Sequence, residues 1–375
     1  MDFGFSQEQE QLRAAAREYL RTELPASFAR AMLEDAAGFT EEAWKGLSEL
    51  GWLGLTAPER FGGSGLGLLD LVLVLEEAGA VALPGPFVST VSLSLPAILA
   101  TADEDQLGAL VPEIATGVRR VACAIAERSG LWDAAGIAAT ARRDEGGYVL
   151  DGCKLFVPDA GVADTIVLVA RLDDGLGFFA LPATLPGLAV RPMQTVDLTR
   201  RLGAVTLESV RVESDCLLGR RAHGASVLDR IIDTAKVGLA AEMTGAAERA
   251  LTMTVEYAAV REQFGRAIAT FQAIQHRCAD MKVDVENAKS LTYFAAWAID
   301  SGDPGAALAA AMAKAFASDA CPRVVADAVQ LHGGIGFTWE HDLHIYFKRV
   351  KADELTYGDA TANREQVARS LELVG

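Results

Sequence analysis

The sequence has few basic residues for its length, and this shortage limits what the protein can bind. Its 375 residues include 34 Lys and Arg against 51 Asp and Glu, which gives a formal net charge of −17. Nucleic-acid binders obtain their affinity from Lys and Arg that meet phosphates, so we do not expect that class of protein. An anionic ligand such as a coenzyme would need a local basic pocket within an acidic protein.

Cysteine is also scarce, and its spacing excludes the common metal and redox motifs. The five cysteines lie far apart, and no pair has the spacing of a zinc or thioredoxin-like motif. We interpret them as reduced packing residues of a cytosolic protein. His341 and His344 are three residues apart and could share one face of a helix, but no matched third ligand accompanies them. No metal site is therefore expected.

Targeting and membrane segments are not evident in the sequence. The N-terminus reaches Gln7 and Glu8 without a basic region, so a secretory signal is not expected. The most apolar stretch, residues 66–100, contains Asp70 and Pro84, which favours buried helices over a membrane span. Because half of the residues are hydrophobic, we expect an ordered cytoplasmic protein, and its length suggests more than one core.

The first segment, residues 1–117, has the pattern of a helical domain. Residues 7–24 are rich in strong helix formers, and Ser6 precedes them as an N-cap. Thr40 precedes a second predicted helix, which Gly51 closes. The glycine-rich run at 58–65 follows no predicted strand, so it is a loop and not a dinucleotide-binding fingerprint.

The second segment, residues 118–221, changes to short β-rich runs separated by turn residues. The predicted strands cover residues 148–150, 165–170, 177–181 and 205–212. Their spacing suits an antiparallel sheet or a small β-barrel domain. Because no helical pattern lies between these runs, a parallel Rossmann sheet is not expected.

The third segment, residues 222–375, returns to long helices. From Ile274 to Ala295, small and apolar residues recur at three- and four-residue steps, which is typical of a bundle helix. Residues 306–317 form an alanine-rich helix, and Thr361 is the expected cap of the last helix. The sequence therefore predicts an α+β, mainly α fold: an N-terminal helical domain, a middle antiparallel β domain and a C-terminal four-helix-bundle-like domain.

Three passages identify a resemblance to a known family. They are the run YAAVREQFG at 257–265 with Phe271 and Gln272 after it, the run QLHGGIGFT at 330–338, and the stretch from Gly51 to Gly65. Together they resemble the acyl-CoA dehydrogenase family, and the order of segments agrees over the whole chain. The first two passages at this separation are specific, whereas each glycine cluster alone would be a weak signal.

The resemblance implies an FAD enzyme that oxidises the Cα–Cβ bond of an acyl-CoA thioester. A base removes the α-proton while hydride leaves the β-carbon for the flavin N5. Family members are usually tetramers built from dimers, each flavin lies between two subunits, and electrons commonly pass to a flavoprotein. Fatty acid or sterol catabolism is the implied context. The residues matching the family's flavin-binding motifs are Arg261, Gln263, Phe264, Gln272, Gln330, Gly333 and Gly334.

These residue types suit a dinucleotide, although each also has an ordinary structural explanation. A guanidinium such as that of Arg261 pairs well with a pyrophosphate, and it could equally be a helix-surface charge. Gly333 and Gly334 allow a backbone to approach a ligand closely, and they could equally end a helix. Because all seven residues stand in the family's order, we favour the flavin role.

The positions of the family's catalytic base depart from its pattern. The family glutamate is matched by Gly358, and the alternative position on the long helix is matched by Ala235. Neither residue can accept a proton. Asp359 lies one residue later and is the remaining catalytic candidate in this region. The chain therefore resembles a family member that has lost its own base.

The inner flavin pocket has also changed. Ala126 and Pro158 stand where the family has hydroxyl-bearing residues, and Trp132 replaces a serine near the thioester end. The retained residues are those that a subunit lends across an interface to its neighbour's flavin. We therefore hypothesise a subunit of a heteromeric enzyme, similar to bacterial mixed tetramers for sterol and other bulky acyl-CoAs. The alternatives are a homomeric enzyme with Asp359 or an unrecognised base, and a non-catalytic, flavin-free scaffold.

Overall fold

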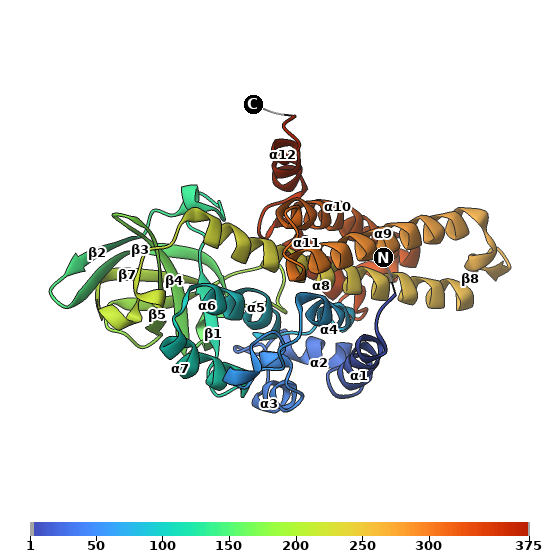
Figure 1. Ribbon diagram of the computed structural model, residues 1–375. Coiled ribbons are helices and arrows are strands. Elements are labelled where there is room, and N and C mark those ends of the chain that lie inside the picture. The colour runs from blue at the N-terminus through green and yellow to red at the C-terminus, as the bar shows by residue number, and fades with distance from the viewer. Residues whose placement is uncertain (1–3, 374–375) are drawn as a thin grey trace. The chain divides into compact units, whose positions relative to one another are not determined.

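The computed structural model describes residues 4–373, and the contacts of the chain group into two compact units (Figure 1). The first unit comprises Met1–Leu33, Leu68–Leu83 and Lys236–Gly375, and the second comprises Glu34–Gly67 and Pro84–Ala235. Within the described residues, no helix is long and apolar enough to cross a membrane.

The first unit is helical, as its sequence pattern predicts. The predicted first helix is confirmed, because the Ser6 side chain accepts a hydrogen bond from the Gln9 backbone N–H and forms a capping box. The helices of this unit are α1 (Gln7–Glu23), α2 (Ala26–Met32), α4 (Leu68–Ala80), most of α8 (Ala225–Val260), α9 (Gln272–Asp300), α10 (Ala306–His332), α11 (Leu343–Leu355) and α12 (Ala360–Ser370).

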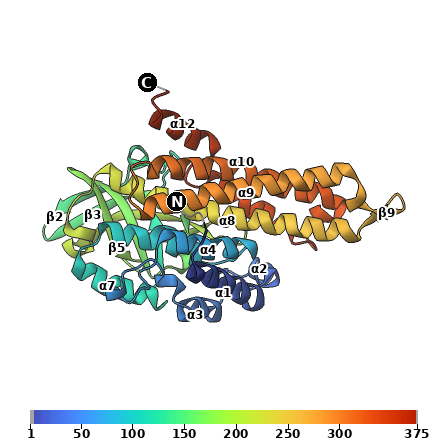
Figure 2. The same ribbon diagram turned by 45° about the vertical axis from the view of Figure 1, so that its right-hand side comes forward.

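Long helices form the body of this unit. Helices α8 and α9 run beside each other, and a short hairpin, β8 (Glu262–Gln263) and β9 (Arg266–Ala267), joins them at one end (Figures 1 and 2). Helix α10 packs along α9, and its alanines at 309–311 are buried because small side chains allow close helix packing.

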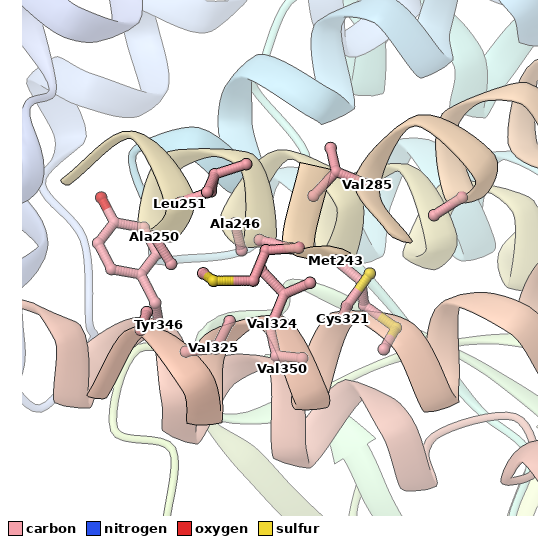
Figure 3. Packing of buried hydrophobic residues seen from close by; sticks show 14 of the residues in the cluster. Met243, Ala246, Ala250, Leu251, Val285, Cys321, Val324, Val325, Tyr346 and Val350 are labelled. Atoms are coloured by element: carbon pink, nitrogen blue, oxygen red, sulfur yellow. The ribbon is translucent and has the colours of Figure 1, made fainter. Parts of the chain in front are cut away.

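Buried residues of α8, α9, α10 and α11 make one hydrophobic core (Figure 3). Met243, Val324 and Val350 meet within it, and none of their side chains has measurable exposure. The hydroxyl of Tyr346 donates to the backbone carbonyl of Ala80 at 2.9 Å, which satisfies the one polar group of that ring. This core fixes the ends of the helices that carry the candidate site.

The second unit combines short helices with a sheet. The expected helix after Thr40 is confirmed: the Thr40 side chain caps α3 (Glu41–Glu49), and Gly51 follows with a left-handed φ of 74°. Farther along, a π-helical turn, Thr90–Ser94, lies between two short helices. The other helices of this unit are α5 (Phe87–Ser89), α6 (Leu95–Thr101) and α7 (Glu104–Ala115).

The middle sheet has seven strands, and it differs from the prediction in its pairing. The order is β1-β4-β2-β3-β7-β6, with β5 paired to β4. Four of these pairings are antiparallel as expected, whereas β1–β4 and β2–β4 are parallel. The strands are β1 (Val121–Ala124), β2 (Thr140–Asp144), β3 (Gly147–Pro158), β4 (Thr165–Leu172), β5 (Gly175–Pro182), β6 (Leu188–Met193) and β7 (Leu202–Glu213).

Strands β1 and β2 both run parallel to β4 and pair with different stretches of it. Val121 to Ala124 pair with Thr165 to Leu168, and Thr140 pairs with Arg171 farther along the strand. Periodicity in a single strand does not encode which distant strand becomes its neighbour. β6 pairs only with β7 among the described strands, so the hydrogen-bonded order does not close into a barrel.

Candidate functional site

The first group of candidate flavin residues lies on the hairpin after α8. Phe264 and Gly265 have φ values of 54° and 78°, so two consecutive left-handed residues make the turn. This conformation costs energy for a phenylalanine. The Phe264 side chain is 93% exposed, and its ring meets the edge of Phe271 at 6.1 Å between centroids. The turn therefore presents an aromatic ring to the surroundings.

Arg261 is held by its backbone, while its side chain is exposed. Its N–H donates to the Tyr257 carbonyl at 2.8 Å, and its carbonyl accepts from the Ile268 N–H at 2.8 Å. Within residues 4–373 the guanidinium has no hydrogen-bond or ion-pair partner. Gln272 is also exposed, whereas the Gln263 side chain donates to the carbonyl of Glu262 at 2.8 Å. An unpaired arginine in so acidic a chain can pair with an anionic ligand.

The second group lies at the end of α10. Gln330 is exposed, and Gly333 ends the helix with φ 65° and ψ −141°, a conformation that essentially only glycine adopts. A Cβ atom placed on Gly333 or Gly334 would meet no atom within 4 Å. These glycines therefore expose their backbone, so a ligand can approach it closely.

Two contacts hold the two groups at the same end of the helices. The rings of Tyr257 and His332 stack at 4.4 Å between centroids with an interplanar angle of 21°. Tyr257 lies one turn before Arg261, and His332 directly precedes Gly333. On the neighbouring helix faces, an ion pair of 3.1 Å joins Arg277 of α9 to Asp327 of α10.

A pocket of about 530 Å³ opens beside Gln330. Aromatic walls with an amide and an ammonium group suit a flat, partly polar ligand. The Lys348 Nζ atom lies 3.8 Å from the centre of the Trp339 ring. The pocket is lined by residues that include Gln330, Gly336, Phe337, Trp339, Phe347 and Lys348.

The catalytic candidate Asp359 is engaged in a helix cap. Its carboxylate accepts a hydrogen bond of 2.8 Å from the Ala362 N–H at the start of α12. The expected cap at Thr361 is therefore wrong: the helix begins at Ala360, and Thr361 lies within its first turn. Both residue types are good caps, and the chain uses the one that stands before the helix.

A buried lysine, which sequence reasoning missed, holds the turn before α12. The Lys314 ammonium donates to the carbonyls of Glu354 at 3.0 Å and Gly358 at 2.9 Å. The Asn363 amide also donates to Gly358 at 2.9 Å. Burial lowers the pKa of Lys314 to about 8. Gly358, with φ 89°, is thus fixed in a tight turn without an acidic side chain.

Other positions at which the sequence lacks the family's proton-accepting or hydroxyl-bearing side chains lie in well-packed parts of the structure. Ala235 is fully buried on α8, and Ala126 is buried after β1. Phe156 has a left-handed φ of 55° at a register shift between β3 and β7, and the residue is 41% exposed. Bulges of this kind redirect side chains next to binding sites. The left-handed backbone of Phe156 could not be predicted from the sequence.

A buried ion pair braces the same part of the sheet. Lys154 of β3 and Glu127 lie 2.6 Å apart, and Lys154 also donates to the Ile125 carbonyl at 3.0 Å. The Glu127 carboxylate accepts from the Ala138 and Ala139 N–H groups as well. Burial lowers the pKa of Lys154, while the carboxylate of Glu127 opposes that shift.

The histidines near the pocket are not arranged as metal ligands. His341 accepts a hydrogen bond of 3.2 Å from the Leu343 N–H through its Nδ1 atom, and His344 packs on the edge of Trp339. Over residues 4–373, no group of three or more His, Cys, Asp and Glu residues could hold a metal ion.

Family models for acyl-CoA dehydrogenases match three consecutive stretches of the chain. The model of the N-terminal domain matches residues 6–118, that of the middle domain 122–210, and that of the C-terminal domain 222–372. The match covers the helical and sheet regions in the order that the structure shows.

Similar proteins align over nearly the full chain. The 3-(aryl)acrylate reductase of Clostridium sporogenes is 30% identical over 98% of this chain and 99% of its own. A structure of the ChsE4-ChsE5 complex from Mycobacterium tuberculosis is 29% identical with a TM-score of 0.91, covering 100% of both chains. A Tcur3481-Tcur3483 steroid ACAD structure is 32% identical with a TM-score of 0.88, covering 98% of both.

Proposed function

Because the chain belongs to the FAD-dependent acyl-CoA dehydrogenase family, we propose that it lends half of a flavin site to a related subunit that supplies the base. At the coarser level it is an acyl-CoA dehydrogenase-like oxidoreductase with the family's three-domain architecture. The domain bounds 1–117, 118–221 and 222–375 remain a prediction. Mixed assembly and the loss of the base are the proposal.

One observation carries the proposal: the two sides of the site differ. Arg261 and Gln330 are exposed at one end of the helices, and the nearby Gly333 backbone is open. By contrast, Gly358 and Ala235 bear no acid, and the carboxylate of Asp359 is used as a helix cap. The outward-facing set therefore fits a ligand, whereas the positions that would hold a base offer none.

The residues present fit a dinucleotide in chemical type. We assign the pyrophosphate to the Arg261 guanidinium and to the backbone near Gly333 and Gly334. The Gln330 and Gln272 amides can hydrogen-bond the polar parts of the cofactor. When bound, the flavin supplies the hydride acceptor at its N5 atom.

In this proposal the chain binds and orients the flavin, and the related subunit removes the α-proton of the acyl-CoA. The ChsE4-ChsE5 structure shows that a similar chain occurs in a complex of two named proteins. The Trp132 side chain stands where a serine would meet the thioester, which suggests a bulky rather than straight acyl group. A flavoprotein is the expected electron acceptor.

Two other functions are compatible with the family membership. In a homomeric enzyme, Asp359 or another residue would act as the base. In a non-catalytic scaffold, the chain would keep the fold without flavin. The unpaired Arg261 and the open glycine backbone favour a ligand-binding role over the scaffold.

The test begins with the chain expressed alone. We expect little bound flavin and no bleaching by any acyl-CoA, because the inner pocket and the base are missing. Co-expression with a related subunit that carries the missing glutamate should give a flavoprotein that acyl-CoA bleaches. Stoichiometric flavin that is bleached in the chain alone would contradict the proposal, and a colourless co-expressed complex would support the scaffold.

A further inference from the structure

His332 lies between two aromatic rings at the end of α10. It stacks on Tyr257 at 4.4 Å, and the His341 ring lies 4.7 Å away on a tilt of 59°. Its side chain is nearly fully buried, with 3% exposure of the residue. This stack joins the last turns of α8 to the end of α10, so it links the Arg261 hairpin to the turn at Gly333.

The hydrogen bond of His332 fixes where its lone pair lies. Its Nδ1–H donates to the Ala328 carbonyl at 2.8 Å, so Nε2 is the unprotonated nitrogen of the neutral ring. Nε2 is buried and has no hydrogen-bond partner among residues 4–373. A proton added there would place an unpaired donor and a charge in a buried site.

Among residues 4–373, no carboxylate forms a hydrogen bond or an ion pair with the His332 ring that could stabilise such a charge. His341 is the nearest titratable neighbour, and burial lowers the pKa of His332 from its ordinary value. Burial likewise lowers the pKa of His341, with the proximity of His332 as the next cause. Two ion pairs lie near the end of α10: Arg277 on α9 with Asp327, and Arg30 on α2 with Asp342. The other titratable groups there are Tyr257 on α8, and His344 and Lys348 on α11.

We propose that neutral His332 is a positioning residue for the flavin-binding set, and that its protonation separates the ends of α8 and α10. The Tyr257–His332–His341 stack then acts as a pH-sensitive clamp. At neutral pH the stack keeps the Arg261 hairpin and the Gly333–Gly334 backbone at one end of the helices. In acid the clamp opens and the set loses its geometry. This inference rests on the proposed flavin role.

The test compares His332→Phe and His332→Asn with the wild-type chain, all in complex with the related subunit. His332→Phe keeps a stacking ring without a titratable nitrogen. His332→Asn keeps a donor for the Ala328 carbonyl and loses the stack, so it remains informative if the phenylalanine variant does not fold. His276→Phe on α9 is the matched control, since His276 is exposed and outside the stack. FAD affinity and the amide protection factors of residues 257–261 and 330–336 are measured from pH 7 to pH 5.

In the wild type and His276→Phe, we expect FAD affinity to fall about ten-fold and amide protection, relative to the intrinsic exchange rate at each pH, to fall about ten-fold toward pH 5. Both measurements should be flat with pH in the two His332 variants, with weaker FAD binding for His332→Asn at pH 7. A wild type without pH dependence, or a His332→Phe variant that follows the wild-type profile, would overturn the inference. An intact exchange transition without FAD binding at any pH would contradict the proposed function and leave the clamp standing.

Discussion

At the residue scale, the clearest feature is that the catalytic candidate Asp359 is engaged in a helix cap. Asp359 stands one residue after the position of the family's base, yet its carboxylate accepts from the Ala362 N–H. Lys314 and Asn363 hold the Gly358 carbonyl beside it. The hydrogen bond to the Ala362 N–H holds the Asp359 side chain at the start of α12.

Two substitutions of Asp359 separate capping from catalysis. Asp359→Asn retains an acceptor for the Ala362 N–H, so stability and flavin bleaching in the complex should remain near the wild-type values. Asp359→Ala removes the cap and should lower the free energy of unfolding by about 1 kcal/mol. Urea unfolding and bleaching rates measure both effects. A loss of bleaching in a stable Asp359→Asn variant would identify Asp359 as the base.

Because Lys314 is buried, we expect the stability of the folded chain to change with pH in the alkaline range. Its pKa is about 8 in the folded chain and near 10.4 when unfolded, so the unfolded chain holds the proton longer. Stability should therefore rise between these values, by about 2 kcal/mol from pH 7.5 to 9.5 relative to Lys314→Met. Urea unfolding at the two pH values measures the difference, with the exposed Lys351→Met as control. Parallel curves for wild type and Lys314→Met would contradict it.

At the element scale, the hairpin after α8 is built to present side chains. Phe264 takes a left-handed conformation that a smaller residue would take more easily, and its ring is exposed. Arg261 has an anchored backbone and an unpaired guanidinium. Neighbouring Arg266 instead lies over the Phe271 ring at 4.2 Å. The two arginines therefore have different roles within one short element.

Arg261→Gln and Arg266→Gln should give different results. The first should weaken FAD binding in the complex roughly 10- to 100-fold, the value of one charge-assisted contact, while the melting temperature of the chain stays unchanged. The second should leave FAD affinity near the wild-type value. Fluorescence titration of FAD and thermal unfolding measure the two quantities. Equal losses for both variants would show that the hairpin binds through general charge.

The buried ion pair between Lys154 and Glu127 in the sheet domain should contribute strongly to the free energy of unfolding. Glu127→Ala would leave the Lys154 ammonium buried without its carboxylate, which should lower the free energy of unfolding by roughly 3–5 kcal/mol. Glu145→Ala, in the exposed turn between β2 and β3, is the matched control and should change little. Urea unfolding tests the pair, and a loss below about 1 kcal/mol for Glu127→Ala would be inconsistent with a charged, buried pair.

Local signals explain which elements could be predicted. The caps at Ser6 and Thr40 and the strands at 165–170 and 177–181 follow from side-chain type and period, and the structure confirms them. The parallel pairing of β1 with β4 could not be predicted, since it joins segments far apart in the chain. Lys314 was missed because a lysine in an alanine-rich helix usually faces solvent.

At the scale of the whole molecule, we propose that the chain carries half of a flavin site. The outward set around Arg261 and Gln330 follows the family pattern and is exposed, and its assignment to flavin remains a prediction. The base positions Gly358 and Ala235 carry no acid. We therefore propose that the chain functions only when a related chain complements it, and that its own pocket contributes no second flavin.

The stoichiometry of flavin in the assembled protein tests this claim most directly. We would purify the chain with a related subunit that carries the glutamate, and measure bound FAD against the amounts of both chains. We expect about one FAD for each pair of unlike chains, because only the related subunit's pocket is complete in this proposal. One FAD for every chain of the complex, two for each pair of unlike chains, would contradict the proposal.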